Sequence, residues 1–548
     1  MTGLEEAQLG RRIATDFPFF CETFIKIKTK DAEVVPFVLR PYQIRLWQLM
    51  QKMEKEGRPV RVIVLKSRQL GFSTMMQCYL LWRTITNPYS GCLTVAHDES
   101  ASRQLFSKIE FAYENMPKEL FDELEKAKNT AIRGKKLTFG APLDSEFHVD
   151  TANNKGLGRG FTFQRCHLSE LAFWEKIEDI FYGLMAALGK RPGTECVIES
   201  TANGLGNFHY KLWKRATSGK SMWEPFFVGW NEDPDCQMPC PEGFVFSSEE
   251  KELARRYKLS RDQLYWRQIT IEDECNGDVD KFRQEYPIDA EEAFIVSGNP
   301  YFGQKAIENA FKAVKEPVNW GDLELDPVDG KPKLVRGRDE GVDKEHASWW
   351  IWKTPEKEHP YVIGADVAGG TGKDFSSAHV LDLKTEEYVA TFRGKLDPDE
   401  FAFQLNWMGR TYNVALIAPE KNGEGRATLI TLQKQVFYPR LFFHQEVDEW
   451  GGGVRHTWGW KTTVRSRPTM LAQFASALRQ QKPTLYCERT VNELGSFIRV
   501  DSPQRLAEAA EGANDDMVIS AGIANASEVR MAGSEYVDLS EYMDGDVF

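Results

Sequence analysis

The chain has 548 residues, a length of roughly three to four average domains or of two large α/β domains. It carries 69 Lys and Arg against 81 Asp and Glu, a net charge of −12, and 42% of its residues are hydrophobic. These values exclude wholesale disorder and a generally basic nucleic-acid binder, so any contact with nucleic acid must come from local patches. No apolar run reaches the roughly 18–20 residues of a membrane helix, and the N-terminus has no signal-peptide pattern, which predicts a soluble intracellular protein with no membrane contact.

The composition changes along the chain predict four segments. Apolar strand-like runs alternate with helical periods up to residue 230, which is typical of a mostly parallel sheet with crossover helices. Residues 231–345 are rich in charge, Pro and Gly and are expected to form a lid or linker subdomain. Strand-like runs return over 346–527, which predicts a second α/β domain, and the acidic segment 528–548 is expected to be a flexible tail.

The nine cysteines are scattered singly, which argues against a disulfide framework and for a reducing compartment. Only Cys236 and Cys240 have a spacing that suggests zinc. No second ligand pair follows within range, so ordinary thiols in a core or loop are the favoured interpretation.

The segment VRVIVLKSRQLGFSTMMQCYLLW has the layout of a phosphate-binding loop: a strand, a polar turn and a helix that begins near Phe72. Against the pattern G-x-x-x-x-G-K-[ST], Gly71 and Ser73 match, but Lys66 replaces the first glycine and Phe72 replaces the lysine. Lys66 and Arg68 can still supply the positive charge that a triphosphate needs. A charged turn without a nucleotide is the alternative. The predicted ATP-binding residues of this segment are Lys66, Ser67, Arg68, Gln69, Leu70, Gly71, Phe72, Ser73 and Thr74, with Ser73 as a Mg²⁺ ligand.

Three further segments strengthen this hypothesis. LRPYQIRLW offers Tyr42 to stack on adenine and Gln43 to bond its edge. The run FTFQRCHLSELAFW places Glu170 at a strand end, where a carboxylate can polarise the attacking water, although Ser169 stands in place of the usual aspartate. The strand ECVIES ends in polar groups suited to sensing a γ-phosphate, and ordinary turn chemistry is the alternative for them: Ser200, Thr201 and Asn203.

These motifs resemble the large terminase subunit of tailed bacteriophages, the motor that packages DNA into a procapsid. The resemblance covers roughly residues 15–527 and rests on RPYQ, KSRQLGFST, GLGRGFTF, ESTANG and FRQEYPIDAEEAFIVSG. It implies a P-loop ATPase domain with a mostly parallel sheet over 1–230, followed by an RNase H-like α/β nuclease domain. It also implies a coupling role for the ESTANG residues and an arginine finger, either Arg159 acting in trans or Arg68 acting in cis. A phosphate or DNA contact, or a surface salt bridge, is the alternative for these arginines.

The second half carries acids in the order of an RNase H-like nuclease. Asp366 ends one strand, Glu420 ends another, and Asp515 begins an apolar helix. Each alone could be a turn former, a surface acid or a helix cap. Together they predict a site for two divalent ions, Mg²⁺ or Mn²⁺, that stabilise the attacking and leaving oxygens of a phosphodiester. The resemblance implies Asp366, Glu420 and Asp515 as principal ligands, with Asp516 and Asp374 as additional ligands.

The stretch GGGVRHTWGWKTTVRSRPTM has four cationic side chains, interleaved aromatics and no acid. Such a patch suits the DNA backbone, because phosphate contacts dominate affinity without reading bases. A solvated hairpin is the alternative. The predicted DNA-binding residues are Arg455, Lys461, Arg465 and Arg467.

The resemblance implies a motor that uses ATP and Mg²⁺ to move double-stranded DNA, and a nuclease that cuts concatemeric DNA. The implied partners are the portal protein and the small terminase subunit, with a homo-oligomeric ring on the portal and a monomer as the alternative for the isolated chain. The implied location is the host cytoplasm, transiently on the procapsid and not in the mature virion. The rivals are a repair-type helicase-nuclease, which would separate strands, and an ATP-binding scaffold with a decayed P-loop, which would lack DNA-stimulated ATPase activity.

Overall fold

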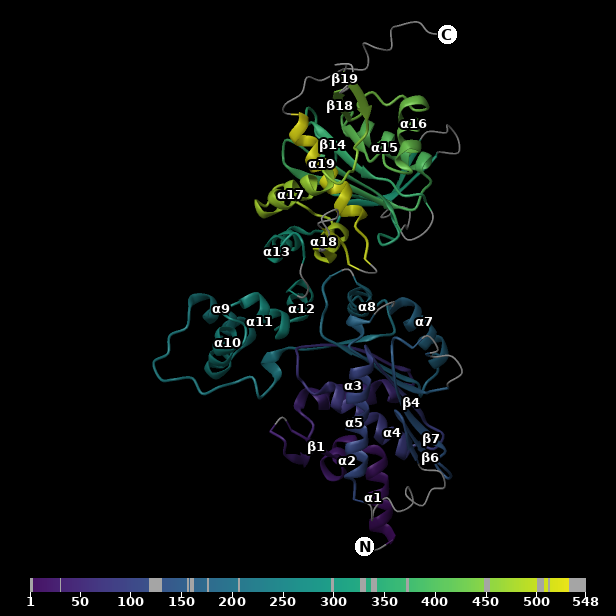
Figure 1. Cartoon of the computed structure of the whole chain (residues 1–548), viewed down its shortest axis with the longest axis vertical. Helices are drawn as coiled ribbons and strands as arrows, with labels where there is room; N and C mark the ends of the chain where they lie inside the picture. Colours follow the sequence, from purple (N-terminus) through teal and green to yellow (C-terminus); the bar gives the residue numbers. More distant parts are fainter. Residues whose placement is uncertain are drawn as a thin grey trace. The chain divides into compact units, whose positions relative to one another are not determined.

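The computed structural model of the chain describes residues 3–531, except 30, 118–130, 155–156, 158–161, 175–176, 206, 297–299, 326–331, 337–342, 371–373, 448–453, 500–506 and 511–512. The chain divides into two compact units, Met1–Ser297 and Gly298–Phe548 (Figure 1). The expected acidic tail 528–548 lies outside the described residues from 532 onward. No described helix is long and apolar enough to span a membrane.

The first unit is built on an eight-stranded sheet in the order β10-β3-β9-β8-β4-β7-β6-β5. Its first six strands are parallel to one another, and β6 and β5 are antiparallel, so the predicted α/β class with a mostly parallel sheet is confirmed. The strands are β3 (Val60–Lys66), β4 (Gly91–Ala96), β5 (Ala131–Arg133), β6 (Lys136–Phe139), β7 (Ser145–Thr151), β8 (Arg165–Ser169), β9 (Glu195–Ser200) and β10 (Glu224–Val228).

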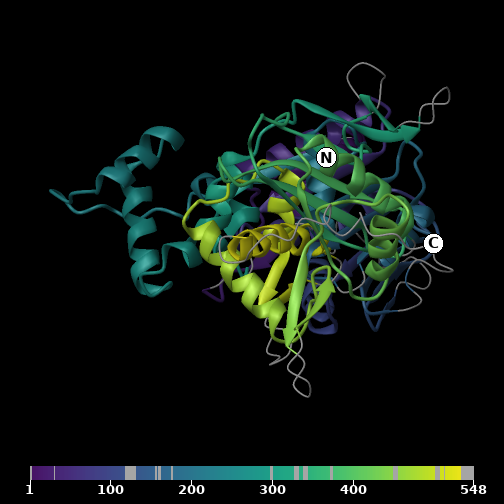
Figure 2. The ribbon, with the colours of Figure 1, turned by 90° about the horizontal axis from the view of Figure 1, so that it is seen from above.

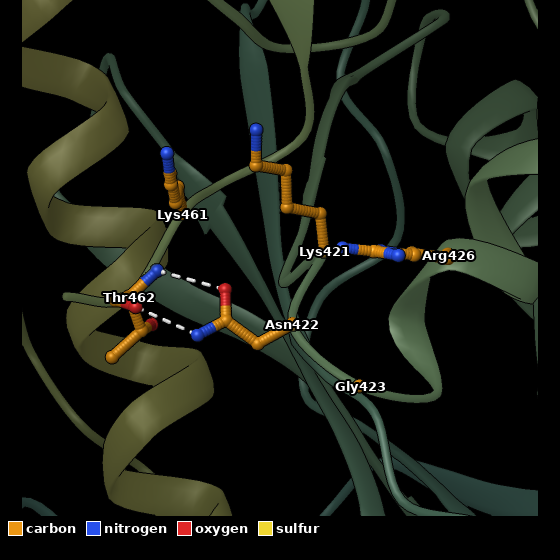
Figure 3. A pocket seen from close by; sticks show the side chains of 6 residues that line it. All are labelled: Lys421, Asn422, Gly423, Arg426, Lys461 and Thr462. Atoms are coloured by element: carbon orange, nitrogen blue, oxygen red, sulfur yellow. Dashed lines mark hydrogen bonds between the residues drawn. The ribbon is translucent and has the colours of Figure 1, made fainter.

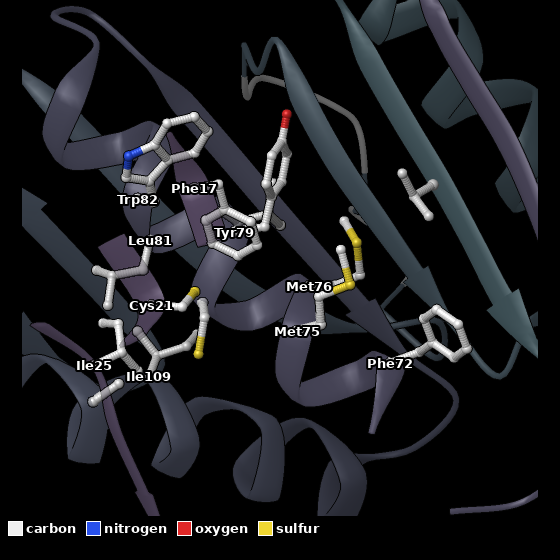
Figure 4. Close-up of a cluster of buried hydrophobic side chains, with 14 of the residues drawn as sticks. Phe17, Cys21, Ile25, Phe72, Met75, Met76, Tyr79, Leu81, Trp82 and Ile109 are labelled. Atoms are coloured by element: carbon white, nitrogen blue, oxygen red, sulfur yellow. The ribbon is translucent and has the colours of Figure 1, made fainter. Parts of the chain in front are cut away.

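Helices cover this sheet and fix the loop after β3. The helix α4 begins at Phe72, as predicted, and runs through the core, where Tyr79 and Trp82 pack against Phe17 of α2 (Figure 4). This core anchors the first turn of α4 and therefore the loop before it. The elements of the layer are α1 (Gly3–Thr15), α2 (Phe17–Phe24), β1 (Lys26–Lys28), β2 (Val34–Pro36), α3 (Pro41–Lys55), α4 (Phe72–Thr86), α5 (Glu99–Glu114), η2 (Leu171–Phe173), α7 (Ile177–Leu188) and α8 (Phe208–Thr217).

A small helical group follows β10 and has an apolar core of its own, which includes Trp230, Cys236 and Phe282. Figure 1 draws α9 to α11 at one side of the first unit's sheet. The nine cysteines are free thiols, and Cys240 accepts a hydrogen bond from Arg261. The elements are η3 (Trp230–Glu232), α9 (Ser248–Tyr257), α10 (Arg261–Asp273), α11 (Val279–Glu285) and α12 (Ala290–Val296).

The second unit contains a seven-stranded sheet in the order β12-β11-β13-β16-β15-β14-β17. Only β14 and β17 pair in parallel. The strand β11 (Asn319–Leu325) lies within the predicted linker segment 231–345, yet it pairs with β13 of this sheet. The other strands are β12 (Pro332–Arg336), β13 (Trp349–Ile351), β14 (Tyr361–Asp366), β15 (Ser376–Asp382), β16 (Glu387–Gly394) and β17 (Leu416–Pro419).

The helix α19 (Asp516–Met531) lies directly on β14, side by side with α17 (Ser466–Arg479) (Figure 2). A Cβ on Gly364 of β14 would stand 2.3 Å from the backbone of Ala524 and of Ser520, so only glycine permits this approach. The packing brings the start of the last helix to the end of β14. The remaining elements are α13 (Gln304–Ala313), α15 (Pro398–Thr411), α16 (Gly425–Lys434), β18 (Phe443–Val447), β19 (Val454–Trp458), α17 (Ser466–Arg479), α18 (Glu488–Ser496), β20 (Phe497–Arg499), β21 (Ala507–Ala509) and α19 (Asp516–Met531).

Candidate functional site

Polar side chains gather at the carboxyl ends of three neighbouring strands in the first unit. Lys66 ends β3, Ser169 ends β8, and Glu199 lies one residue before the end of β9, the strand between them. The carboxyl edge of a parallel sheet is the usual place for a ligand site. The loop after β3 and the first turn of α4 lie at the same edge, because both follow β3 directly.

Lys66 is buried and contacts two carboxylates. Its Nζ lies 3.1 Å from Oε1 of Glu170 and 3.1 Å from Oε1 of Glu199. Burial opposes the charged ammonium, but Glu199 and Glu170 outweigh it and raise the pKa of Lys66 above its ordinary value. Burial likewise opposes the ionised form of Glu199, but Lys66 and His167 outweigh it and lower the pKa of Glu199. The group is therefore a buried ion cluster.

Glu170 has a left-handed backbone, with φ 52° and ψ 46°, a conformation that costs a non-glycine residue roughly 1–2 kcal/mol. Its N–H donates to the carbonyl of Glu199 at 2.6 Å, and its Oε2 accepts from the hydroxyl of Ser200 at 3.3 Å and the N–H of Thr201 at 3.2 Å. Strain of this kind persists where the surroundings fix a functional side chain. Of the residues predicted for coupling, Ser200 and Thr201 thus contact Glu170, whereas Asn203 donates to the carbonyl of Ala172.

The first residues of the predicted phosphate loop are held by two contacts. The hydroxyl of Ser67 donates to the carbonyl of Pro287 at 2.9 Å, and the side chain of Arg68 forms an ion pair with Glu285. Gln69 has a φ of 63°, and Gly71 precedes α4 with a φ of 72°. These contacts hold a turn whose N–H groups precede a helix N-terminus, where phosphate binds readily.

The side chains of Tyr42 and Phe72 belong to the core. Their ring centroids are 5.5 Å apart, and both residues are 1% exposed. Gln43 accepts from the N–H of Arg40 and donates to the carbonyl of Leu70, so its amide braces the loop. Phe72 therefore contributes only its backbone to the loop, because its side chain is buried in the core. This burial explains why an apolar residue stands where the pattern has lysine. The adenine contacts of Tyr42 and Gln43 stay predictions.

Two residues near the loop were missed by sequence reasoning. Glu199 was treated as part of a strand, yet the hydroxyl of Ser73 donates to its Oε1 at 3.1 Å and its Oε2 at 3.2 Å. Lys108 of α5 donates to the hydroxyl of Thr74 at 3.1 Å and so places another cation beside the loop. For Glu199 the sequence signal is an acid directly after the apolar run Cys196–Ile198 of a strand, because a charged residue that is buried must find a partner.

Predicted acids of the second unit come together at the end of β14. Burial and the negative charges of Glu420, Asp516 and Asp515 raise the pKa of Asp366 well above its ordinary value. Asp374 is exposed in the segment before β15. Within the described ranges, no group of three or more His, Cys, Asp or Glu side chains is already arranged to hold a metal ion.

The adjacent acids at the start of α19 have different partners. Oδ2 of Asp515 lies 3.0 Å from Nη2 of Arg467. Oδ2 of Asp516 accepts from the N–H of Phe375 and the amide of Asn514, both at 3.1 Å. Burial raises the pKa of Asp516 to about 6, although these two hydrogen bonds oppose the rise. Arg467, which was predicted to contact DNA, thus pairs with a predicted metal ligand.

A basic pocket of about 390 Å³ lies immediately beyond Glu420 (Figure 3). The backbone of Lys421 donates to the carbonyl of Trp460 at 2.8 Å, and the side chain of Asn422 is hydrogen-bonded to the backbone of Thr462. This pairing places the cations of two distant segments around one pocket. The lining residues are Lys421, Asn422, Gly423, Arg426, Lys461 and Thr462.

The remaining predicted residues are placed as follows. Arg465 is exposed and precedes α17. Arg455 lies in β19, opposite Glu446 in register, and nothing is described of its side chain. Arg159 lies outside the described residues.

No family model matches the chain. Among solved structures, the chain is similar to the HK97 bacteriophage large terminase at 11% identity, over 94% of this chain and 99% of that one, with a TM-score of 0.42. It is similar to the large terminase of the thermophilic bacteriophage D6E in complex with ADP, at 11% identity, 88% and 98% coverage and a TM-score of 0.29. It is also similar to the magnesium-bound large terminase nuclease of thermophilic phage G20c, at 16% identity, 40% and 96% coverage and a TM-score of 0.29.

Proposed function

We propose that the chain is a viral DNA-packaging motor subunit of the large terminase type, with an ATPase in its first unit and a metal-dependent endonuclease in its second. One observation carries the proposal: Lys66 and Ser73 from one motif and Glu170 from another converge with Glu199 at one sheet edge. The two rival functions receive no specific support from this geometry.

In the first unit, the loop N–H groups and Lys66 would hold the phosphates of ATP, and Ser73 would hold Mg²⁺. The donor set fits a dication, because a serine hydroxyl and a carboxylate are hard oxygen ligands already in contact. Mg²⁺ supplies neutralisation of the phosphate charge. Ser200 and Thr201 hold the carboxylate of Glu170, which would orient and polarise the attacking water.

In the second unit, Asp366, Glu420, Asp515 and Asp516 would hold divalent ions, which supply the charge that stabilises a phosphodiester under attack. The donors fit, because carboxylates forced together in a partly buried site are relieved by a dication. Arg467 would balance Asp515.

The basic pocket beside Glu420 would take the DNA backbone. Its cations can contact phosphates without reading bases, as expected for a nuclease that cuts long concatemers. Double-stranded DNA is thus the proposed substrate of both units. The portal protein and the small terminase subunit are the proposed partners, with a homo-oligomeric ring on the portal. The proposed location is the host cytoplasm and, transiently, the procapsid.

The test is a pair of reciprocal separations in the full chain. Glu170→Gln should abolish DNA-stimulated ATP hydrolysis and leave plasmid cleavage with Mg²⁺ or Mn²⁺ intact. Asp366→Asn should do the reverse. Strand separation by the purified chain would favour the helicase-nuclease, and ATP binding without DNA-stimulated hydrolysis would favour the scaffold. Loss of both activities in either variant, with the fold preserved, would contradict the assignment of one activity to each unit.

A further inference from the structure

We infer that Glu199 is the carboxylate of the first unit's Mg²⁺ site, taking from β9 the role that an aspartate before Glu170 would otherwise have on β8. This inference rests on the proposed ATPase function. Ser169 on β8 stands where the usual aspartate of such a site would be, so another residue must provide the carboxylate. The sheet supplies the replacement on the neighbouring strand.

Register explains how the exchange works. Ser169 and Glu199 are paired residues of the parallel strands β8 and β9, so their side chains project from the same face of the sheet side by side. The hydroxyl of Ser169 lies 3.5 Å from Oε2 of Glu199. A short side chain at Ser169 leaves room for the longer glutamate to reach the place where an aspartate on β8 would end.

The contacts of Glu199 are those of a metal-directed carboxylate. Both of its oxygens accept from the hydroxyl of Ser73, the P-loop residue that holds Mg²⁺ in enzymes of this type. His167 lies behind it, with Nε2 3.3 Å from Oε2 of Glu199, and the other ring nitrogen of His167 contacts Gln77 at 3.1 Å. Hydrogen-bonded side chains behind a ligand carboxylate orient it in this way.

The charge of the cluster also favours a dication. Lys66 contributes +1 and the two glutamates that it contacts contribute −1 each, so these three side chains sum to −1. The ammonium of Lys108, whose charge also acts on Glu199, lies beside the loop at Thr74. A purely structural counter-ion for Lys66 would need only one glutamate, and Glu170 already supplies it. The second carboxylate is balanced when Mg²⁺ binds beside Ser73, and Lys66 is then available to the phosphates.

The test measures metal binding apart from turnover. It uses the full chain in an Asp366→Asn background, to weaken manganese binding in the second unit, and follows nucleotide-dependent Mn²⁺ binding by electron paramagnetic resonance with a non-hydrolysable ATP analogue. Glu199→Gln should weaken this binding at least tenfold and change metal-free nucleotide affinity less than threefold. Adding Ser169→Asp to Glu199→Gln should restore Mn²⁺ binding to within about threefold, since the register pair places the new carboxylate beside the lost one.

A second variant keeps the test valid if Glu199→Gln does not fold. Glu199→Asp keeps the charge but withdraws it by one methylene, and it should show the same loss. The matched control is Glu195→Gln, which removes a buried carboxylate from the other end of β9, where it pairs with Arg165, and should leave Mn²⁺ binding unchanged. Parental Mn²⁺ binding in Glu199→Gln or in Glu199→Asp would overturn the inference, and so would failure of Ser169→Asp to rescue a folded Glu199→Gln chain. Failure of the parental chain to bind or hydrolyse ATP would instead overturn the proposed function.

Discussion

Replacing Lys66 by alanine should cost both stability and activity, because it leaves the buried carboxylate of Glu199 and the partly buried carboxylate of Glu170 without their shared cation. Each Nζ to oxygen contact is 3.1 Å long, which corresponds to about 5 kcal/mol at an effective dielectric constant of about 20 before desolvation is counted. Removal of one partner of a buried pair typically costs about 3–5 kcal/mol. We expect a loss of that size in the unfolding free energy of the first unit, and at least a hundredfold loss of ATP hydrolysis.

The stability difference between the parental chain and Lys66→Ala should depend on pH. With Lys66 present, the pKa of Glu199 is below its ordinary value, so the contact stabilises the fold above the unfolded-state pKa of about 4.3 and is lost as pH falls through the folded-state pKa. Without Lys66, burial dominates and raises the pKa of Glu199, so the variant becomes more stable as pH falls from 7 towards about 4.3. The stability difference between the two chains should therefore narrow on acidification.

Hydrogen exchange of β3 and β9 peptides in the full chain, in increasing urea at pH 7 and pH 5, measures the first unit alone. Lys52→Ala is the control, because Lys52 is an exposed lysine 3.9 Å from Glu56, and its loss should change stability by less than about 1 kcal/mol. Plasmid cleavage should be retained by Lys66→Ala, which shows that the second unit is folded. A stability loss no larger than that of the control, or one that is equal at both pH values, would refute the buried ion cluster.

Four further outcomes are expected. Glu170→Gln should trap bound ATP, measured by filter retention of labelled nucleotide, and parental turnover would move the hydrolytic carboxylate elsewhere. Asp366→Asn and Asp515→Asn should each remove metal-dependent plasmid cleavage while ATP hydrolysis continues, and cleavage that persists without contaminating nuclease would contradict the metal assignment. Lys421→Ala should weaken DNA binding alike for all sequences and reduce the salt slope of log Kd by about 1, so a sequence-specific loss would argue against a phosphate contact. Burial lowers the pKa of His209 to about 3, so between about pH 6.5 and 3 the unfolded chain binds a proton at this residue that the folded chain does not, and the free energy of unfolding falls as the pH falls. His209→Phe should reduce this pH dependence in acid unfolding. An unchanged pH dependence would assign it to other groups.

The local part of the proposed ATP site was predictable from the sequence. A strand, turn and helix placed Gly71 and Ser73 correctly because the three elements are consecutive in the chain. The burial of Phe72 was not predictable in the same way, since its partners Tyr42 and Phe226 come from α3 and β10. A pattern of seven or eight residues contains no information on these neighbours.

The second unit shows where sequence separation limits prediction. The acids were identified by their places at strand and helix ends, and the packing of α19 on β14 at Gly364 brings two of those ends together. The basic pocket could not be predicted, because Lys421 and Lys461 meet only through the pairing of Glu420 with Trp460. The predicted basic stretch contained one side of the pocket and lacked the other.

Glu199 combines both limits and indicates how the sequence could be interpreted more sharply. In ECVIES, Glu195 and Glu199 are four residues apart, and with the alternation of a strand they share one face. Both are buried, and each therefore requires cations: Arg165 and Arg83 contact Glu195, whereas Lys66 contacts Glu199. Ser169 lacks the acid of its motif, and Glu199 is the residue paired with it on the neighbouring strand. When a motif lacks its acid, the residues on the paired strand should therefore be checked before the site is considered decayed.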